Sequence, residues 1–350
     1  MPSGRRVPFG RDQLRRLACT EGRSPTHRPP GRRAPRLWDD EIEAARDRIR
    51  TESKEFVTRL PRADTTGSVL ERAHARRRAE SSYIFRSDHG VDRTIPGPAG
   101  PLRVREFRPE RVDGAMLHIH GGGWMTGEPE LTDLLHEALS NEVHLAIVSV
   151  AYRLSPEHPY PAGPDDCEAA ALWLIEHAAA EYGTTRLVVG GESAGAHLSA
   201  VTLLRLRDRH ELVEKFCAAN LVFGPYDLSA TPSAMGIGMN PEADILDPED
   251  MRFMTEQFVP GTGPQQRRHP DISPMYADLR GMPPALFTVG TADHLVDDTL
   301  FFANRWVAAG NEAELLVYPD APHGLMGVPT VLSHWWPRLE AFLRHRLEGV

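Results

Sequence analysis

From residue 115 onward, the chain alternates short apolar runs with segments long enough to form helices, and this alternation limits the folds open to it. The runs hold five or six residues, are rich in Val, Leu and Ile, and follow one another as AMLHI, LAIVSV, RLVVG, AANLVF, ALFTVG and AELLVY. Such runs, with little polar alternation, are typical of parallel strands that helices cover on both faces. The sequence therefore predicts a doubly wound α/β sheet with right-handed crossovers.

Apolar periodicity predicts the helices that accompany these strands. The helices are expected over 165–181, 194–209, 296–309 and 330–347. Ahead of the alternation, residues 37–80 are expected to be mainly helical, with Asp39 or Asp40 as the N-cap. Two strands are predicted near 83–92 and 102–107, separated by a turn with the sequence PGPAGP.

The first 36 residues differ from the rest of the chain in charge and composition. They hold ten arginines against two acidic residues, Asp12 and Glu21, and they are rich in Pro and Gly. The sequence predicts a disordered tail there, without the apolar core of a secretory signal. A nucleic-acid-binding arm is the alternative, but a net charge of −9 for the whole chain argues against a wider basic surface. We therefore expect no nucleic-acid partner.

Cysteine content and hydropathy restrict the remaining classes of protein. No apolar run approaches the roughly 18 residues that a membrane helix needs, so a soluble protein without a membrane partner is expected. Three cysteines, Cys19, Cys167 and Cys217, are too few and too scattered for a disulfide framework or a zinc site. We expect reduced, buried thiols in a cytoplasmic protein that holds no metal.

One interval of about 55 residues, between NLVFGPYD and PPALFTVG, shows no strand pattern. A structureless connection of that length is improbable inside a compact domain, so the interval is predicted to form a lid or cap over an active site. A helix is expected to begin there with Asp247 as its N-cap and Pro248 at its first position. Its apolar face would carry Met251, Met254 and Phe258, which either pack the cap or line an apolar substrate pocket.

The sequence GESAG places Ser193 between a predicted strand and a predicted helix. That position is the one required of a nucleophile elbow, in which a sharp turn projects the serine hydroxyl. Gly191 and Gly195 allow the crowded turn, and the helix that follows aims free N–H groups at any oxyanion formed beside Ser193. The pattern indicates nucleophilic catalysis by serine.

A serine nucleophile needs a base and a group that orients the base. In the α/β-hydrolase order the acid and then the histidine follow the serine, on loops after later strands. The loop TADHLVDD offers Asp293, Asp297 and Asp298, and the loop PDAPHGL offers His323. Asp293 is preferred because it is nearest to its strand end, whereas Asp297 and Asp298 are expected on the following helix in solvated or capping roles.

The run HGGGW, residues 120–124, comes directly after the first of the six apolar runs, AMLHI. Three glycines either shape a tight loop or let backbone N–H groups approach a ligand closely. The elbow at Ser193 favours the second interpretation, in which these N–H groups face a carbonyl oxygen as it becomes negative. Trp124 either lines the pocket or holds the loop in place, and Tyr226 is a further candidate for the pocket wall.

Together these motifs resemble the hormone-sensitive-lipase-type branch of the α/β-hydrolase family, the bacterial carboxylesterases marked by an HGGG motif. The resemblance runs from about residue 80 to the end and includes HGGGW, YRLSPEHPYPAGPDDC, GESAG, DISPMYADL, TADHLVDD and PHG. It implies an eight-stranded, mostly parallel sheet with a helical cap. Core segments at 81–225 and 273–350 would then carry a cap formed by 37–80 and 226–272.

The resemblance also implies roles for individual residues. Ser193 would be the nucleophile, Asp293 the acid and His323 the base of a serine esterase. The oxyanion hole would be formed by the backbone N–H groups of Gly122, Gly123 and Ala194. Two neighbouring residues, His120 and Gly121, would shape its loop. No cofactor is implied. The expected substrate is a small carboxylic ester of short to medium chain length, hydrolysed through an acyl-enzyme.

Departures from the family pattern keep alternatives open. Glu192 stands where Asp is commoner, and AGAHL stands where AGGNL is usual. The run SAGAHL resembles kynurenine formamidases, so an arylformamidase or amidase with the same triad is the alternative. A non-catalytic receptor resembling the gibberellin receptors is disfavoured because His323 is present, and an interfacial lipase because no amphipathic membrane-binding segment is evident. Two copies could pair as a homodimer along the last predicted strand and its neighbouring helix.

Overall fold

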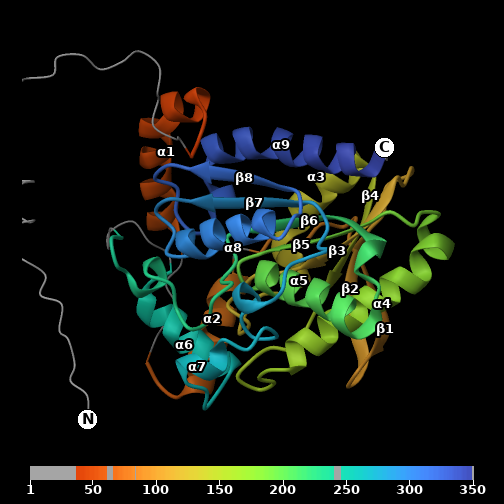
Figure 1. Cartoon of the computed structure of the whole chain (residues 1–350), viewed down its shortest axis with the longest axis horizontal. Helices are drawn as coiled ribbons and strands as arrows, with labels where there is room; N and C mark the ends of the chain where they lie inside the picture. Colours follow the sequence, from red (N-terminus) through yellow and green to blue (C-terminus); the bar gives the residue numbers. More distant parts are fainter. Residues whose placement is uncertain (1–36, 61–65, 83, 240–245, 349–350) are drawn as a thin grey trace, which may run out of the picture. The chain divides into compact units, whose positions relative to one another are not determined.

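A computed structural model describes residues 37–60, 66–82, 84–239 and 246–348. The predicted tail 1–36 and Cys19 lie outside these residues. Within them, eight strands form one sheet in the order β1-β2-β4-β3-β5-β6-β7-β8 (Figure 1). The strands are β1 (Val91–Gly97), β2 (Gly100–Phe107), β3 (Gly114–Ile119), β4 (Leu145–Val150), β5 (Leu187–Glu192), β6 (Phe216–Val222), β7 (Ala285–Gly290) and β8 (Ala313–Tyr318).

The sheet has the direction pattern that the sequence predicts. β1 pairs with β2 and β2 with β4 in antiparallel fashion, whereas the pairs from β4 through β3, β5, β6 and β7 to β8 are all parallel. Each of the six apolar runs forms one of the parallel strands. The prediction of a doubly wound, mostly parallel α/β sheet is therefore confirmed.

Helices cover the sheet on both faces (Figure 1). One face carries α1 (Asp40–Arg59), α3 (Asp133–Val143) and α9 (Pro329–Glu348), and the other carries α4 (Ala162–Tyr182), α5 (Ala194–Arg205) and α8 (Val296–Ala308). The predicted helix 194–209 ends as α-helix at Arg205 and continues as one π turn over Leu206–His210. Helix α3 was not predicted.

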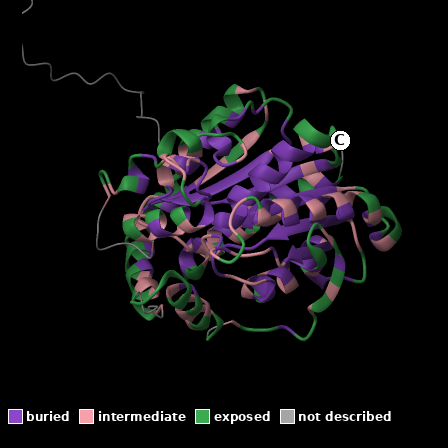
Figure 2. Ribbon diagram, turned by 90° about the horizontal axis from the view of Figure 1, so that it is seen from below, coloured by how far each residue is buried: buried purple, intermediate pink, exposed green. Residues whose placement is uncertain are grey.

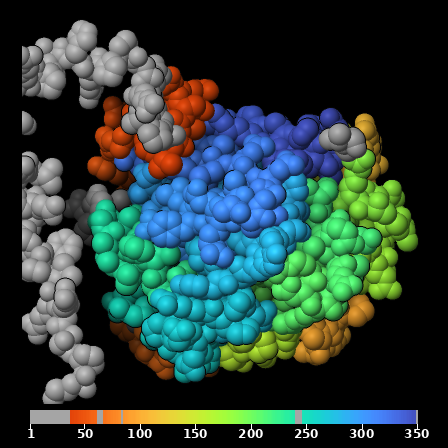
Figure 3. Space-filling view, viewed as in Figure 1, coloured from red at the N-terminus to blue at the C-terminus, as the bar shows by residue number. Residues whose placement is uncertain are grey.

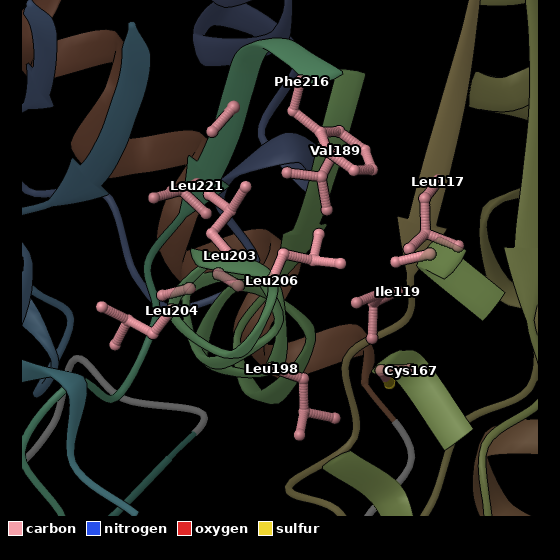
Figure 4. Close-up of a cluster of buried hydrophobic side chains, with 14 of the residues drawn as sticks. Leu117, Ile119, Cys167, Val189, Leu198, Leu203, Leu204, Leu206, Phe216 and Leu221 are labelled. Atoms are coloured by element: carbon pink, nitrogen blue, oxygen red, sulfur yellow. The ribbon is translucent and has the colours of Figure 1, made fainter. Parts of the chain in front are cut away.

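Two clusters of buried apolar side chains fill the space between the sheet and its helices. Successive strand residues point to opposite faces, so Leu117 and Ile119 of β3 pack toward α4 and α5 while Met116 packs toward α9. Figure 4 shows Leu198 and Leu203 of α5 beside Ile119 and Val189, and Figure 2 shows the central strands of the sheet buried, whereas the edge strands β1 and β8 are partly exposed. Burial on both faces explains why these strands read as continuous apolar runs.

The first strand lies later in the chain than predicted. The expectation was 83–92, but β1 begins at Val91 and pairs with β2 from Val91↔Glu106 to Gly97↔Gly100. Side chains bind the backbone of Ser87 instead of a partner strand: Asp133 accepts from its N–H at 2.8 Å and Arg105 donates to its C=O at 2.7 Å. Most of the predicted turn PGPAGP therefore belongs to the two strands.

The two helices of segment 37–80 lie against different parts of the molecule. Helix α1 packs on α9, with Ile42 and Ile49 in the cluster between that helix and the sheet. Helix α2 (Val69–Ser81) instead lies beside α6 (Pro248–Phe258), where the guanidinium of Arg72 stands 3.7 Å from the centre of the Phe253 ring. Only α2 therefore accompanies the 226–272 insertion, whereas α1 belongs to the core layer.

The insertion contains the helix that the sequence predicts at its centre. Asp247 is the N-cap of α6 and accepts a hydrogen bond from the Asp250 N–H at 2.7 Å, and Pro248 is the first helical residue. A short helix, α7 (Pro264–Arg267), follows. In Figure 3 this teal-coloured insertion lies beside α8 on the face of the molecule that is shown. Residues 240–245 of the insertion lie outside the described part of the chain.

The two described cysteines are both free thiols, but they differ in exposure. Cys167 of α4 is fully buried, as expected, and burial raises the pKa of its thiol well above the ordinary value. Cys217 of β6 is only partly buried, because it lies near the start of its strand. The prediction that both are buried is therefore wrong for Cys217.

Candidate active site

Ser193 sits at a sharp turn between β5 and α5. Its backbone has φ 54° and ψ −122°, a conformation that non-glycine residues rarely adopt. The elbow packs so closely on the end of β3 that a Cβ at Gly191 or Gly195 would overlap the carbonyl oxygen of Ile119. Glycine is required at both positions, which explains the GESAG spacing.

Three side chains from separate loops meet at this turn. His323 Nε2 lies 3.0 Å from Ser193 Oγ, and His323 Nδ1 lies 2.8 Å from Asp293 Oδ2. Because a carboxylate accepts only, Nδ1 carries the proton and Nε2 presents its lone pair to the serine hydroxyl. The structure thus brings together the serine, histidine and aspartate that the sequence singled out.

Surrounding contacts fix the acid and the base. Asp293 is fully buried, and its second oxygen, Oδ1, accepts the Leu295 N–H at 2.8 Å. The ring of Phe223, which follows β6, lies 4.5 Å from the ring of His323. Sequence inspection did not single out Phe223, since an aromatic residue at a strand end carries no signal of its own. These contacts hold the imidazole between Asp293 and Ser193.

The glycine run after β3 forms a loop with unusual backbone angles. Gly122 has φ 114° and Gly123 has φ 57°, and the carbonyl of Gly122 accepts from the N–H groups of Met125 and Thr126. In the part of the chain that the structure describes, the N–H groups of Gly122, Gly123 and Ala194 have no protein acceptor. An oxyanion in front of Ser193 would satisfy such donors.

His120 and Gly121 shape the start of this loop. His120 is buried with its ring stacked on Tyr152 at 4.3 Å, and its Nδ1 donates to the Gly121 carbonyl at 2.7 Å. Burial lowers the pKa of His120 to about 3, so the ring is neutral. The Cα of Gly121 faces the Glu192 carbonyl and the Ser193 side chain so closely that a Cβ there would be crowded. These residues hold the loop against the elbow.

Trp124 holds the loop in place, and the structure thereby decides between its two sequence interpretations. Its side chain is 4% exposed, its indole N–H donates to His197 Nδ1 at 3.1 Å, and its ring stacks on Phe258 at 4.6 Å with 9° between the planes. A pocket wall would instead present a free face to the substrate. Phe258 accordingly packs the cap.

The remaining pocket candidates divide between the site and the core. Met254 lies over the glycine loop, because a Cβ at Gly123 would overlap its sulfur. Met251 is half-buried one turn earlier in α6. Tyr226 is fully buried, and its ring stacks on Phe302 of α8 at 4.3 Å. The structure therefore places Tyr226 in the core, packed against α8.

Helix α2 supports the glycine loop from outside, a role that sequence inspection missed. Arg77 donates to the carbonyl of Met125 at 2.8 Å and forms a two-pronged ion pair with Glu157. Glu80 accepts the Gly127 N–H at 2.6 Å. An arginine and a glutamate three residues apart on a helix are ordinary surface residues, so the sequence offered no signal for this contact.

The carboxylates of Asp297 and Asp298 also depart from expectation. Both lie in the first turn of α8, but they bind the start of the insertion rather than solvent. Asp297 accepts the Ser233 N–H at 2.9 Å, and Asp298 accepts the Asp227 N–H at 2.7 Å and the Thr231 hydroxyl at 2.6 Å. Asp298 is fully buried. The prediction that both lie on the following helix is confirmed, whereas the predicted solvated or capping role is wrong for Asp298.

Burial raises the pKa of Asp298 to about 7, against the lowering effect of its hydrogen bonds. An unfolded aspartate has a pKa near 3.9, so the folded state binds more protons between roughly pH 4 and pH 7. The contribution of Asp298 to stability therefore falls as the pH rises through this window. Asp298→Asn keeps a donor and an acceptor without the charge, and we expect it to gain about 2 to 4 kcal/mol over the wild type between pH 5 and pH 8.

Thermal unfolding of both proteins at pH 5, 6, 7 and 8 measures this difference. The wild-type Tm should fall relative to that of Asp298→Asn as the pH rises. Parallel curves would show that Asp298 does not titrate in this range. Asp297→Asn is the matched control, since that carboxylate lies beside Asp298 in the same helical turn and is partly exposed.

Comparison with known proteins places the chain in a family. The profile of the α/β-hydrolase fold family matches residues 116–327. The carboxylic ester hydrolase LipN of Mycobacterium tuberculosis is 34% identical over 268 residues, which cover 74% of this chain and 70% of the relative. None of the helices in the described ranges is long and apolar enough to span a membrane.

Solved structures agree with this assignment. A hyperthermophilic esterase from the archaeon Pyrobaculum calidifontis superposes with a TM-score of 0.73 at 28% identity, covering 85% of this chain and 97% of the esterase. An esterase from the bacterial hormone-sensitive lipase family superposes with a TM-score of 0.70 at 27% identity, covering 87% and 98%. The chain therefore belongs to the α/β-hydrolase fold family and, within it, to the carboxylesterases of the hormone-sensitive-lipase type.

Proposed function

We propose that the protein hydrolyses small carboxylic esters of short to medium chain length through an acyl-enzyme on Ser193. The hydrogen-bonded line from Ser193 Oγ to His323 and Asp293 carries this proposal. His323 Nε2 takes the hydroxyl proton as Oγ attacks the ester carbonyl, and then gives that proton to the departing alcohol. Water, activated by the same nitrogen, releases the acid and restores the serine. Asp293 holds the tautomer and stabilises the imidazolium.

We further propose that the N–H groups of Gly122, Gly123 and Ala194 bind the oxyanion of each tetrahedral intermediate. Their lack of a protein acceptor and the positive φ angles of the two glycines support this role. A fixed backbone donor of this kind contributes roughly 3 to 4 kcal/mol to lowering the barrier. The support given by Tyr152, Trp124 and Arg77 would keep these donors in place before substrate arrives.

A series of p-nitrophenyl esters from acetate to decanoate, with N-formylkynurenine as the competing substrate, tests the substrate class. We expect the highest kcat/KM between acetate and hexanoate and a much lower value for the formamide. A higher kcat/KM for N-formylkynurenine than for p-nitrophenyl butyrate would favour an arylformamidase instead. No contact in the site favours that alternative, because both ring nitrogens of His197 in the SAGAHL run bind protein groups.

The position of Met254 predicts how the cap limits the substrate. Its half-buried side chain covers Gly123, so a long chain entering there must displace it. We expect Met254→Ala to raise kcat/KM for p-nitrophenyl octanoate relative to acetate by about tenfold, the value of one or two buried methylenes. Met251→Ala is the matched control on the same helix and should leave the ratio unchanged. An unchanged ratio in Met254→Ala would exclude this residue from the substrate path.

We also propose that two copies pair as a homodimer along β8. This strand ends the sheet, bonding only to β7 in the described residues, and α8 beside it exposes Phe301 and Val307. Sedimentation velocity tests the proposal, with Phe301→Glu and Val307→Glu combined to break the dimer. A wild-type protein that sediments as a monomer at every concentration would contradict it.

The cytoplasmic location is likewise our proposal, to be tested by fractionation of producing cells.

A further inference from the structure

His197 is the residue of the AGAHL departure that the proposed mechanism does not use. It lies one helical turn after Ser193 on α5, and its backbone N–H donates to the Ser193 carbonyl at 3.1 Å. The side chain is fully buried, although histidine carries two polar nitrogens. A buried imidazole needs partners for both, and the identity of these partners shows what the residue does.

Both nitrogens of His197 bind groups from outside α5. Nδ1 accepts the indole N–H of Trp124 at 3.1 Å, and Nε2 lies 2.8 Å from the carbonyl oxygen of Ile272. An indole N–H only donates and a carbonyl only accepts, so the neutral tautomer with its proton on Nε2 satisfies both bonds. Burial lowers the pKa of His197 to about 4, which keeps the ring in this neutral form.

The two partners belong to the two parts of the molecule that must meet over Ser193. Trp124 directly follows Gly123 in the glycine loop, and Ile272 ends the 226–272 insertion. The Trp124 ring also stacks on Phe258, the last residue of α6, and the His197 ring meets Phe258 edge-on at 5.8 Å. His197 therefore touches the loop, the cap helix and the end of the cap at one point.

We propose that His197 is a positioning residue that links the oxyanion-hole loop to the cap, so that the seating of the cap sets the placement of the Gly122 and Gly123 N–H groups. This inference rests on the proposed function of the loop. The bond to Trp124 orients the loop and acts on kcat, because the oxyanion forms only during reaction. The bond to Ile272 holds the cap and acts on KM, because the cap covers the substrate.

The histidine of the SAGAHL run then has a structural role, and this role does not determine whether the enzyme prefers an ester or an amide substrate. A histidine at position 197 has one ring nitrogen for each of two partners. These are the indole N–H of the tryptophan after the third glycine and the backbone carbonyl at the end of the cap. We expect the leaving-group preference to be the same in all variants at residue 197, since its ring contacts neither the serine hydroxyl nor the His323 imidazole in the described structure.

Two substitutions separate the two bonds. Counted from Cβ, the Asn amide oxygen lies as many bonds away as His Nδ1, and the Gln amide nitrogen as many as His Nε2. His197→Asn keeps an acceptor for Trp124 and loses the bond to Ile272, whereas His197→Gln keeps the Ile272 bond and loses the other. Trp124→Phe removes the indole N–H but keeps a ring to stack on Phe258.

We expect His197→Gln and Trp124→Phe each to lower kcat on p-nitrophenyl butyrate by roughly three- to tenfold with little change in KM, the effect of one lost hydrogen bond. The kcat of the double variant, His197→Gln with Trp124→Phe, should be no lower than that of the slower single variant, because both changes remove the same hydrogen bond between residues 124 and 197. His197→Asn should keep kcat within about twofold and raise KM instead. His177→Gln is the matched control: the His177 ring also contacts a tryptophan ring, that of Trp173, but on the outer helix α4.

Contrary results are equally specific. Equal losses of kcat in the Asn and Gln variants, or losses that multiply in the double variant, would overturn the inference. Thermal unfolding of each variant separates these outcomes from misfolding, and kinetics are compared only among variants that keep a cooperative transition. Ser193→Ala is assayed alongside. If Ser193→Ala stays active, the proposed function is wrong. If Ser193→Ala is inactive but His197→Gln keeps the wild-type kcat, only the proposed role of His197 is wrong.

Discussion

Ser193→Ala is expected to lower kcat on p-nitrophenyl butyrate by about 10⁴- to 10⁶-fold, with a Tm close to that of the wild type. At the elbow, the Ser193 hydroxyl lies within hydrogen-bonding distance of His323 Nε2. Without it no acyl-enzyme can form, and the remaining rate comes from the oxyanion donors and substrate binding. Steady-state kinetics at high enzyme concentration measure the residual rate.

His323→Ala should cost about as much as Ser193→Ala, and the double variant little more than either, because serine and histidine act as one unit. Ser199→Ala is the matched control. Ser199 lies on the same helix, and its buried hydroxyl donates only to the Gly195 carbonyl at 2.8 Å. Retention of more than about a hundredth of kcat in Ser193→Ala would refute the assignment of the nucleophile.

Arg205→Met is expected to lower stability by about 3 to 5 kcal/mol and Tm by roughly 6 to 10 °C. The Arg205 side chain is only 3% exposed, and it pairs with three carboxylates, those of Asp165, Glu168 and Asp271. Methionine fills a similar volume but leaves these carboxylates without their buried cation. Differential scanning calorimetry measures the loss.

Arg209→Met is the control that distinguishes the effect of removing a buried cation from the effect of removing a positive charge alone. Arg209 also contacts Glu168 and Asp271, but its side chain is 45% exposed. An exposed pair contributes less than about 1 kcal/mol, so this variant should unfold near the wild-type temperature. Equal losses in the two variants would show that net charge, rather than the buried contact, stabilises this cluster. Asp271 also binds the Tyr160 hydroxyl, so Arg205→Met should loosen the cap's attachment and raise KM.

The parallel strands inside the sheet, β3 to β7, could be predicted because they are buried on both faces, which leaves a continuous apolar run in the sequence. Strand β1 could not, since it lies at the sheet edge with polar residues such as Asp92 and Arg93 among its apolar ones. Helix α3 was missed for a related reason: Asp133 and His136 occupy buried positions there, where apolar residues would have marked its face.

Among the site residues, those in local turns could be read from the sequence. The elbow is a five-residue geometry in which glycine has no substitute, and it points to Ser193 directly. Asp293 and His323 follow strand ends, so the common edge of a parallel sheet brings them to the same place. Trp124, Tyr226 and Asp298 gave no such signal, because a buried tryptophan, tyrosine or aspartate is defined by partners far away in the chain.

The sequence by itself determined the sheet, the elbow and the order of the three candidate catalytic residues, since these depend on residue type and on local periodicity. Only the tertiary structure decided that Trp124 packs under the cap, that Met254 covers Gly123 and that His197 joins the loop to Ile272. These contacts join residues between 73 and 134 positions apart in the chain. Their energies depend on burial and distance, which a sequence pattern does not contain.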